Sequence, residues 1–295
     1  MQPPVEAVAW IERTLGRDAR VVICRRLTGG LTSHVHQVTI SRRGRRASYV
    51  LRWWGERATY APRAVADETA ILTALAASDV PVPRLIAATT DVAHGGPAVL
   101  MTRVPGRVYL MPRDCEHWLA QMAHMLARIH ALAVAAPPFE PWLDTGALAP
   151  PADATRPEIW RAAIALVREP APAVPACFIH RDYQHFNLLW TRERLTGVVD
   201  WAGACTGPPA LDVGHCRLNL ALLFSVEVAE RFRDTYEAAA GRTVHPWWDV
   251  HALLSYGPEW KQFLPLQIDR RAPLDPAGMA SRVEDLLERA LRRAS

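Results

Sequence analysis

The sequence predicts an α+β protein of two lobes, in which a small five-stranded antiparallel sheet precedes a larger and mainly helical part. Three observations support this fold class. Runs rich in β-branched and aromatic residues crowd the first third of the chain, and apolar stripes at helical spacing dominate the rest. A Pro-Gly break at 104–107 separates the two patterns. We therefore expect an amino-terminal lobe over 1–104 and a carboxyl-terminal lobe over 105–295.

The composition of the 295 residues is that of an ordinary globular protein, with 50% hydrophobic and 22% charged side chains. No apolar run approaches the roughly 20 residues that span a bilayer, and the first residues do not resemble a secretory signal. We expect a cytoplasmic protein without a membrane partner. The five cysteines are scattered and form no C-x-x-C pair, which favours buried or half-buried thiols over a zinc site or a disulfide framework.

The first lobe begins with three β-rich runs, separated by Gly-Gly and Arg-Gly-Arg turns, which predict an antiparallel meander. These runs are 21–27, 35–41 and 47–54. A helix follows, whose inward face carries Val65, Glu68, Leu72 and Leu75. Two further apolar runs, 84–89 and 97–104, complete the predicted sheet.

The cluster RRGRR at 42–46 lies between two of these strands. It is either the solvated tip of a hairpin or, since the net charge of +4 is concentrated in the first half of the chain, a patch for nucleic acid. Because no aromatic residues interleave with these arginines, we favour the hairpin tip and expect no nucleic-acid partner.

The second lobe contains two clear helical stripes. One consists of Leu119, Met122, Leu126, Ile129 and Ala133, and the other of Met279, Val283, Leu286 and Leu287. The run LNLALLFSV at 218–226 predicts a buried helix. The strand-like material in this half is limited to 177–180, 187–190 and 196–200.

Three polar side chains follow these short strands in the stretch HRDYQHFNLLWTRERLTGVVD. Asp182 comes just after the first strand, Asn187 begins the second, and Asp200 comes just past the third. A hairpin of the last two strands is expected to bring Asn187 and Asp200 close together. A carboxylate and a carboxamide suit Mg²⁺ that keeps its waters and a phosphate. Asp182 is then placed to orient a hydroxyl and to accept its proton.

Further candidates lie upstream. The turn at Gly29 and Gly30 allows backbone N–H groups to approach phosphates, although a Gly-Gly turn alone is weak evidence. Arg52 lies on the third strand, and Glu68 interrupts the apolar face of the next helix. An inward carboxylate usually needs a charged partner, and Arg52 is the nearest cation on a strand.

The order of these motifs resembles the kinase-like phosphotransferases of the aminoglycoside phosphotransferase family, which also includes choline, homoserine, methylthioribose and macrolide kinases. The matching pieces extend over nearly the whole chain and include MTRVPG, LARIHAL, the H-R-D-x-x-x-x-N loop, VVDW and GPPALDVG. The resemblance implies a two-lobed protein-kinase-like fold. It also implies transfer of the γ-phosphate of ATP or GTP to a hydroxyl of a small molecule. The acceptor would be an aminoglycoside or other antibiotic, a sugar or an amino alcohol, and an antibiotic acceptor would indicate a role in resistance.

The resemblance also implies roles for individual residues. Asp182 would be the catalytic carboxylate, while Asn187 and Asp200 would hold Mg²⁺. The nucleotide would be contacted by Gly29, Gly30, Ser33, Arg52, Glu68 and the backbone of Arg103 and Val104. His180 and Asp212 would brace the catalytic loop from behind.

Two positions depart from the family pattern. Arg52 stands where many members have lysine, and the only lysine in the chain is Lys261. Arginine keeps the charge but changes the geometry of a phosphate contact. Phe186 stands where relatives often have glycine. The departure at Arg52 favours one alternative function, a catalytically degenerate kinase-fold module that only binds nucleotide.

Several side chains of the second lobe allow two interpretations. His185 either faces the substrate or is simply exposed on its loop, and His130 is expected to be structural. The tryptophans Trp247, Trp248 and Trp260 line an acceptor pocket or belong to the core. A polycationic acceptor would need carboxylates, for which the candidates are Asp234, Glu237, Asp249, Glu259 and Asp269. The sequence leaves the acceptor, the choice of ATP or GTP and the oligomeric state open.

Overall fold

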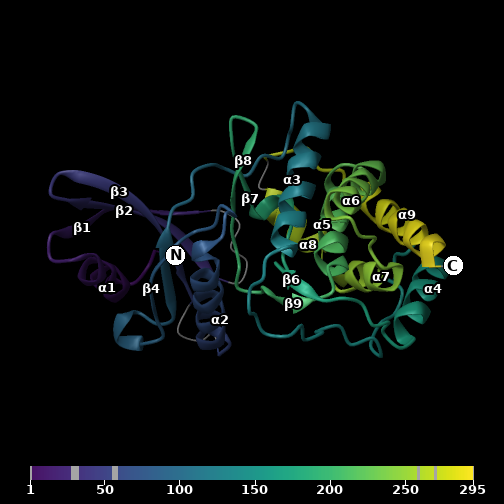
Figure 1. The fold of residues 1–295 in the computed structure, drawn as a ribbon, viewed down its shortest axis with the longest axis horizontal. Coiled ribbons are helices and arrows are strands. Elements are labelled where there is room, and N and C mark those ends of the chain that lie inside the picture. Colours follow the sequence, from purple (N-terminus) through teal and green to yellow (C-terminus); the bar gives the residue numbers. More distant parts are fainter. Residues whose placement is uncertain (1, 28–32, 55–58, 258–259, 269–270, 295) are drawn as a thin grey trace. The chain divides into compact units, whose positions relative to one another are not determined.

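The computed structural model describes residues 2–27, 33–54, 59–257, 260–268 and 271–294. The chain divides into two compact units (Figure 1). The first comprises Met1–Gly106 together with Thr196–Gly203, and the second comprises Arg107–Leu195 and Ala204–Ser295. The returning segment Thr196–Gly203 therefore belongs with the first unit although it is distant from that unit in the sequence.

The first unit is built on one antiparallel sheet with strand order β1-β2-β3-β5-β4. Its elements are α1 (Val5–Leu15), β1 (Ala19–Arg26), β2 (His34–Arg42), β3 (Arg45–Trp53), α2 (Ala61–Ala74), β4 (Leu85–Thr89) and β5 (Ala98–Thr102). The predicted five-stranded antiparallel sheet is thus confirmed. The 42–46 cluster is the tip of the β2–β3 hairpin, where Arg42 pairs with Arg45 and Arg43 contacts Asp18 at 2.9 Å.

Helix α1 was not anticipated by the sequence analysis. Its side chains Trp10 and Ile11 are buried against the strand residues Val38 and Leu51. Removing apolar surface of this kind from water contributes about 25 cal/mol per Å². Burial against the sheet therefore explains why an eleven-residue helix, too short to be stable alone, forms here.

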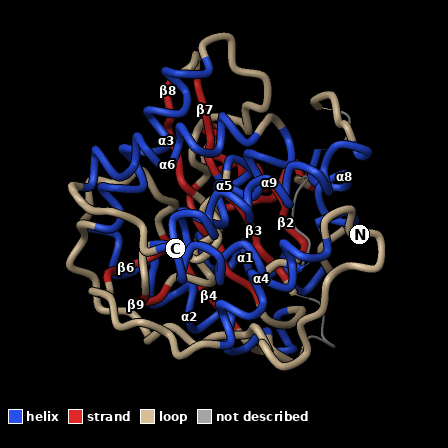
Figure 2. The backbone as a smooth tube through the Cα atoms, turned by 90° about the vertical axis from the view of Figure 1, so that its right-hand side faces the viewer, coloured by secondary structure: helices blue, strands red, loops and turns tan. Residues whose placement is uncertain are grey.

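The second unit is mainly helical. Its elements are α3 (Cys115–His130), α4 (Pro157–Arg168), β6 (Cys177–Ile179), β7 (Leu188–Thr191), β9 (Cys205–Gly207), α5 (Ala210–Leu223), α6 (Val226–Ala240), α7 (Pro246–Leu254), α8 (Trp260–Ile268) and α9 (Pro276–Ala294). Strand β6 pairs with β9, and β7 pairs with β8 (Arg194–Val198) in a hairpin (Figure 2). The combination of a sheet unit and a helical unit confirms the predicted fold class.

Helix α5 is the centre of the second unit, where it packs against α6, α7 and α9 (Figure 1). Every residue from Ala210 to Leu222 is buried. Gly214 permits the close approach of α7, since a Cβ at this position would lie 2.5 Å from the Cβ of Ala252. The small side chain at this position thus lets α5 and α7 pack closely.

Two predicted boundaries differ from the structure. The run 218–226 is not one helix, because α5 ends at Leu223 and Ser225 caps α6 by accepting a hydrogen bond from the backbone of Val228 at 3.3 Å. The stripe assigned to α3 extends three positions too far, because the helix ends at His130 and Ala133 lies beyond it. Among the described residues, no helix has the length and apolarity that crossing a membrane requires.

Candidate functional site

A buried cluster of charge lies in the first unit around Arg52. The Nη1 atom of Arg52 donates to Glu68 at 3.1 Å and to Asp200 at 2.5 Å, and its Nε donates to the Ser33 hydroxyl at 2.9 Å. Arg52 and Glu68 are 7% and 1% exposed, so both are withdrawn from water. Arg52 also lies over the ring of Trp54. One guanidinium thus organises three polar side chains from different parts of the chain.

Local structure explains why these residues meet. Strand β3 places Arg52 between Val35 of β2 and Val99 of β5. Helix α2 carries Glu68 in its buried stripe. The segment that bears Asp200 is tied to the first unit by a hydrogen bond from the Val198 nitrogen to the Pro81 oxygen.

Asp200 itself has a left-handed backbone conformation, with φ at 70°. Aspartate enters this region more readily than most residues. Strand β8 ends two residues earlier, at Val198. The Asp200 carboxylate remains partly exposed, with 37% of its side-chain surface accessible.

The electrostatics of this cluster favour a permanent cation. Burial alone would lower the pKa of Arg52, but the charges of Asp200 and Glu68 outweigh it, so the pKa is raised. Burial raises the pKa of Glu68, and the charge of Arg52 opposes this effect. Arg52 therefore remains charged under all ordinary conditions and holds Asp200 as its more solvated partner.

The second unit contributes the loop that follows β6. The Asp182 carboxylate accepts hydrogen bonds from Gln184 Nε2 and from Asn187 Nδ2, both at 2.8 Å. Asn187 Nδ2 also donates to the backbone oxygen of Asp182 at 2.9 Å. Since the Asn187 nitrogen donates to Asp182, Oδ1 is the side-chain atom with the chemistry of a cation ligand. The spacing of the loop motif thus has a direct structural cause.

Asp212 at the start of α5 supports this loop from the interior. Its carboxylate accepts from the backbone nitrogens of His180 and Arg181, at 2.7 and 2.6 Å, and from His130 Nε2 at 3.0 Å. Asp212 is fully buried. Burial would raise its pKa, but the hydrogen bond and charge of His130 and the contacts with His180 lower it overall. Ionised Asp212 therefore fixes the backbone immediately before Asp182.

His130 and His180 take part in the same arrangement. The Tyr236 hydroxyl lies 2.7 Å from His130 Nδ1, which orients the imidazole toward Asp212. His180 is fully buried, and its Nδ1 accepts from the backbone nitrogen of Asp182 at 3.2 Å. Both histidines are built into the interior of the second unit.

The other predicted nucleotide contacts are Gly29, Gly30, Arg103 and Val104. Gly29 and Gly30 lie outside the described residues. Arg103 and Val104 follow β5 outside any helix or strand, and Arg103 is exposed while Val104 is half-buried. The structure brings Ser33, Arg52, Glu68 and Asp200 together in the first unit, and His180, Asp182, Asn187 and Asp212 in the second.

Several assignments in the second unit need correction. His185 is neither exposed nor open to a substrate, because it is fully buried and packs against Trp118 and Phe224. Burial lowers its pKa to about 3. Trp247 and Trp260 are buried as well, which favours the core over a pocket wall.

Sequence reasoning did not single out three side chains that contact Asp182 or Arg181 in the loop after β6. These are Gln184, which lies in the loop itself, His215 and Tyr256. Gln184 lies inside the quoted motif and was overlooked. The signal for His215 was its position three residues after Asp212, which places both on the same face of a helix. Tyr256 follows α7, and no sequence pattern connects it to the loop.

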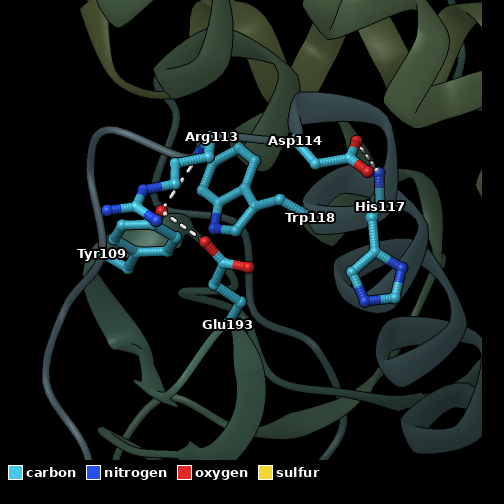
Figure 3. A pocket seen from close by; sticks show the side chains of 6 residues that line it. All are labelled: Tyr109, Arg113, Asp114, His117, Trp118 and Glu193. Carbon is cyan, nitrogen blue, oxygen red and sulfur yellow. Dashed lines mark hydrogen bonds between the residues drawn. The ribbon is translucent and has the colours of Figure 1, made fainter.

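A shallow hollow also lies on the second unit, at the beginning of α3 and the tip of the β7–β8 hairpin (Figure 3). In Figure 3 the Tyr109 hydroxyl lies between the Arg113 backbone nitrogen, from which it accepts at 3.1 Å, and the Glu193 carboxylate, to which it donates at 3.4 Å. The residues that line this hollow are Tyr109, Arg113, Asp114, His117, Trp118 and Glu193. None of the predicted site residues is among them.

The sheet unit, the helical unit and the loop after β6 together define a kinase-like fold. The model of the phosphotransferase enzyme family (APH) matches residues 23–254, and the chain therefore belongs to this family. Comparison with the curated proteins gives no significant match.

Several solved structures share this fold. The apo form of a thermostable mutant of aminoglycoside phosphotransferase APH(4)-Ia is 18% identical, with a TM-score of 0.63 over 98% of this chain and 99% of that one. LicA in complex with AMP is 16% identical, with a TM-score of 0.64 over 98% and 97%. Macrolide 2′-phosphotransferase MphH from Brachybacterium faecium is 21% identical, with a TM-score of 0.56 over 96% and 98%. At these identities the similarity shows a common fold.

Proposed function

We propose that the protein transfers the γ-phosphate of ATP or GTP to a hydroxyl group of a small molecule. The observation that carries this proposal is the geometry of the Asp182 carboxylate, which Gln184 and Asn187 hold in place while Asp212 fixes the backbone before it. Similar folds occur with a nucleotide, as in the APH(4)-Ia mutant with ADP and hygromycin B and in LicA with AMP.

In the proposed reaction Asp182 orients the acceptor hydroxyl and takes its proton as the oxygen attacks the γ-phosphorus. A new bond forms between the acceptor oxygen and phosphorus, while the bond from the γ-phosphorus to the bridging oxygen breaks and releases the nucleoside diphosphate. Phosphoryl transfer requires mainly positioning and neutralisation of charge. Arg52, held by Glu68, provides a fixed positive charge for the phosphates of the nucleotide. The turn with Gly29, Gly30 and Ser33 and the backbone at Arg103 and Val104 complete the proposed nucleotide contacts.

The donor set of the protein fits a magnesium ion. Asn187 offers an amide oxygen and Asp200 a partly exposed carboxylate, and oxygen ligands of these kinds are the ones that Mg²⁺ accepts in nucleotide sites. We propose that these two residues hold the ion, which when bound would neutralise charge on the nucleotide phosphates. In the described structure the Asp200 carboxylate contacts Arg52, so it must share this partner with the ion or exchange it.

We further propose an acceptor with little positive charge. Three of the carboxylates that a polycation would need are already neutralised within the second unit. Asp249 is fully buried and pairs with Arg217, Glu237 pairs with Arg293 at 3.1 Å, and Asp234 pairs with Arg233 at 2.6 Å. Glu259 and Asp269 lie outside the described residues. A neutral or weakly charged antibiotic, a sugar or an amino alcohol therefore fits better than an aminoglycoside.

The test is an acceptor panel read by release of ADP from Mg-ATP, and of GDP from Mg-GTP. The panel contains hygromycin B, a macrolide, neutral sugars and amino alcohols. We expect turnover with at least one acceptor of low charge, and we expect Asp182→Asn to lower kcat by about 10²- to 10⁴-fold, the range of general base catalysis, while nucleotide binding is retained.

The outcomes separate the proposal from its alternative. Nucleotide binding without turnover on any acceptor would instead identify a catalytically degenerate binding module. This is the alternative function that the departure from lysine at Arg52 favours. Loss of nucleotide binding in Asp182→Asn would contradict the role given to this carboxylate. Efficient turnover of hygromycin B in place of the weakly charged compounds would overturn the proposed acceptor class.

A further inference from the structure

His215 is a buried histidine to which the proposed function assigns no role. It lies on α5, three residues after Asp212, and is 4% exposed. Its Nδ1 atom lies 3.4 Å from Oδ1 of Asp182, the oxygen that accepts from Gln184, and this buried ring nitrogen makes no hydrogen bond in the structure. A polar ring atom thus faces the proposed catalytic carboxylate from the interior of the protein.

The surroundings of His215 fix the plane of its ring. The imidazole stacks on the ring of Tyr256, with the centroids 3.8 Å apart and the planes 13° from parallel. The Tyr256 hydroxyl in turn donates to the backbone oxygen of Arg181 at 3.2 Å. The Tyr256 hydroxyl therefore attaches the stacked pair to the loop that carries Asp182. Rotation of the His215 imidazole out of its plane would break the stacking on Tyr256.

The chemistry of the site favours a neutral imidazole. Burial lowers the pKa of His215 to about 3, although the charge of Asp212 works in the opposite direction. A neutral imidazole carries one N–H, and the tautomer follows from the partners of its two nitrogens. With a carboxylate oxygen facing Nδ1, the proton belongs on Nδ1, where it can be donated to Asp182.

We propose that His215 is a positioning residue for phosphoryl transfer, which donates a hydrogen bond from Nδ1 to Oδ1 of Asp182. This inference rests on the proposed function. Together with Gln184 and Asn187, His215 fixes the plane of the carboxylate and hence the direction from which it accepts the hydroxyl proton. A distance of 3.4 Å is long for such a bond in the absence of substrate, and catalytic hydrogen bonds often shorten only in the substrate complex.

The competing explanation is that His215 only fills space between α5 and Tyr256. His251 on α7 is a matched control for this explanation, because it is also 4% exposed, stacks on a neighbouring aromatic ring (Trp247, 5.3 Å and 20°), and has its pKa lowered by burial to about 4. It differs from His215 in the property under test, since its Nδ1 lies by Ser255 and not by Asp182.

The first experiment measures the hydrogen bond directly and needs no acceptor. Nitrogen-15 NMR of histidine-labelled protein, with His215 assigned through His215→Phe, reports which ring nitrogen carries the proton. We expect a neutral ring protonated on Nδ1, with a resonance that shifts in Asp182→Asn and does not shift in His251→Phe. A proton on Nε2, or a resonance that ignores Asp182→Asn, would overturn the proposal.

The second experiment measures catalysis, with the best acceptor of the panel and with water as acceptor in the slow hydrolysis of Mg-ATP. His215→Phe keeps a ring for stacking on Tyr256 but removes the donor, whereas His215→Asn keeps an N–H near the position of Nδ1. We expect His215→Phe to lower kcat by about 10- to 100-fold, as misplaced catalytic groups do, with the KM values for nucleotide and acceptor within about twofold. His215→Asn should recover most of this loss, and His251→Phe should leave kcat unchanged.

Each other outcome has a defined meaning. Unchanged kcat in His215→Phe, or equal losses in His215→Phe, His215→Asn and His251→Phe, would show a packing role and refute positioning. If the wild-type protein turns over neither ATP nor GTP, the proposed function fails, while the NMR experiment still decides whether His215 donates to Asp182. Melting temperatures of all variants, compared with that of the wild type, identify any variant that fails to fold.

Discussion

The buried guanidinium of Arg52 makes a set of hydrogen bonds that the ammonium group of a lysine would not reproduce. Its Nε contacts Ser33, while its Nη1 lies between Glu68 and Asp200. The planar fork of arginine presents donors in fixed and diverging directions, whereas the lysine ammonium is a single point at the end of a flexible stem. Arginine at this strand position, in place of lysine, therefore allows one side chain to bind three partners at the same time.

This arrangement predicts the stability of variants at Arg52. Arg52→Met leaves Glu68 buried without its cation, and breaking one side of a buried ion pair typically costs 3–5 kcal/mol. Because Glu68 can take up a proton, we expect a loss near the lower end, about 3 kcal/mol in the free energy of unfolding measured by urea titration. Arg52→Lys should cost less, since it keeps the charge.

The control is the double variant Arg52→Met with Glu68→Gln, which removes both charges together. It should be more stable than Arg52→Met alone, because no unpaired carboxylate remains in the interior. Equal unfolding midpoints for Arg52→Met and the wild type would show that the ion pair contributes nothing to stability.

At the scale of elements, the structure shows which sequence signals were sufficient. Asp182 and Asn187 are five residues apart on one loop, so their contact is local and the motif spacing indicates it. The inward face that carries Glu68 was indicated by helical spacing, and Arg52 was identified as the nearest cation on a strand. The contact of His215 with Asp182 was not legible, because it depends on how α5 packs behind the loop. The burial of His185 depends in the same way on Trp118 and Phe224, which are distant in the sequence.

The buried histidines of these elements predict sensitivity to acid. His185, His215 and His251 have pKa values lowered to about 3, 3 and 4, against an ordinary value of 6.5. Below pH 6.5 these histidines bind protons in the unfolded chain but stay neutral in the folded protein. The free energy of unfolding therefore falls as the pH falls from 6.5 toward 4. At about 1.4 kcal/mol per pH unit for each group, each histidine should remove about 1–2 kcal/mol between pH 6.5 and 5.

Urea unfolding at pH 7.5 and at pH 5.0 measures this loss. His251→Phe removes one of the three groups without touching the catalytic loop, and it should show a smaller difference between the two pH values than the wild type. Identical differences for the two proteins would mean that His251 is protonated in the folded state or is not protected from water.

At the scale of the whole molecule, the path of the chain divides the proposed metal ligands between the two units. Asn187 belongs to the second unit, but after the β7–β8 hairpin the segment Thr196–Gly203 joins the first unit and carries Asp200 to Arg52. The covalent connection between the two ligands is short, while their noncovalent partners lie in different units. A magnesium ion held by both residues would make their contributions to nucleotide binding depend on one another.

This division predicts the result of a double-mutant cycle on nucleotide binding. If Asn187 and Asp200 hold one magnesium ion, Asn187→Ala and Asp200→Ala should each weaken the binding of Mg-ATP by about 10- to 100-fold. Removing even an outer-shell partner of a metal typically lowers metal affinity by that factor. Once either ligand is gone the ion is lost, so the double variant should bind no more weakly than the weaker single variant. The losses are then strongly non-additive, as for residues that act as a unit.

Calorimetric titration with ATP in the presence and in the absence of Mg²⁺ provides both the test and its control. Without magnesium the wild type and Asn187→Ala should bind ATP with nearly equal affinity, because only the ion connects Asn187 to the phosphates. Asp200→Ala differs in one respect, because it also releases Arg52 from its partner at 2.5 Å. It should therefore bind ATP without magnesium at least as tightly as the wild type. Additive losses in the presence of Mg²⁺ would place Asn187 and Asp200 at separate sites and would refute the shared ion.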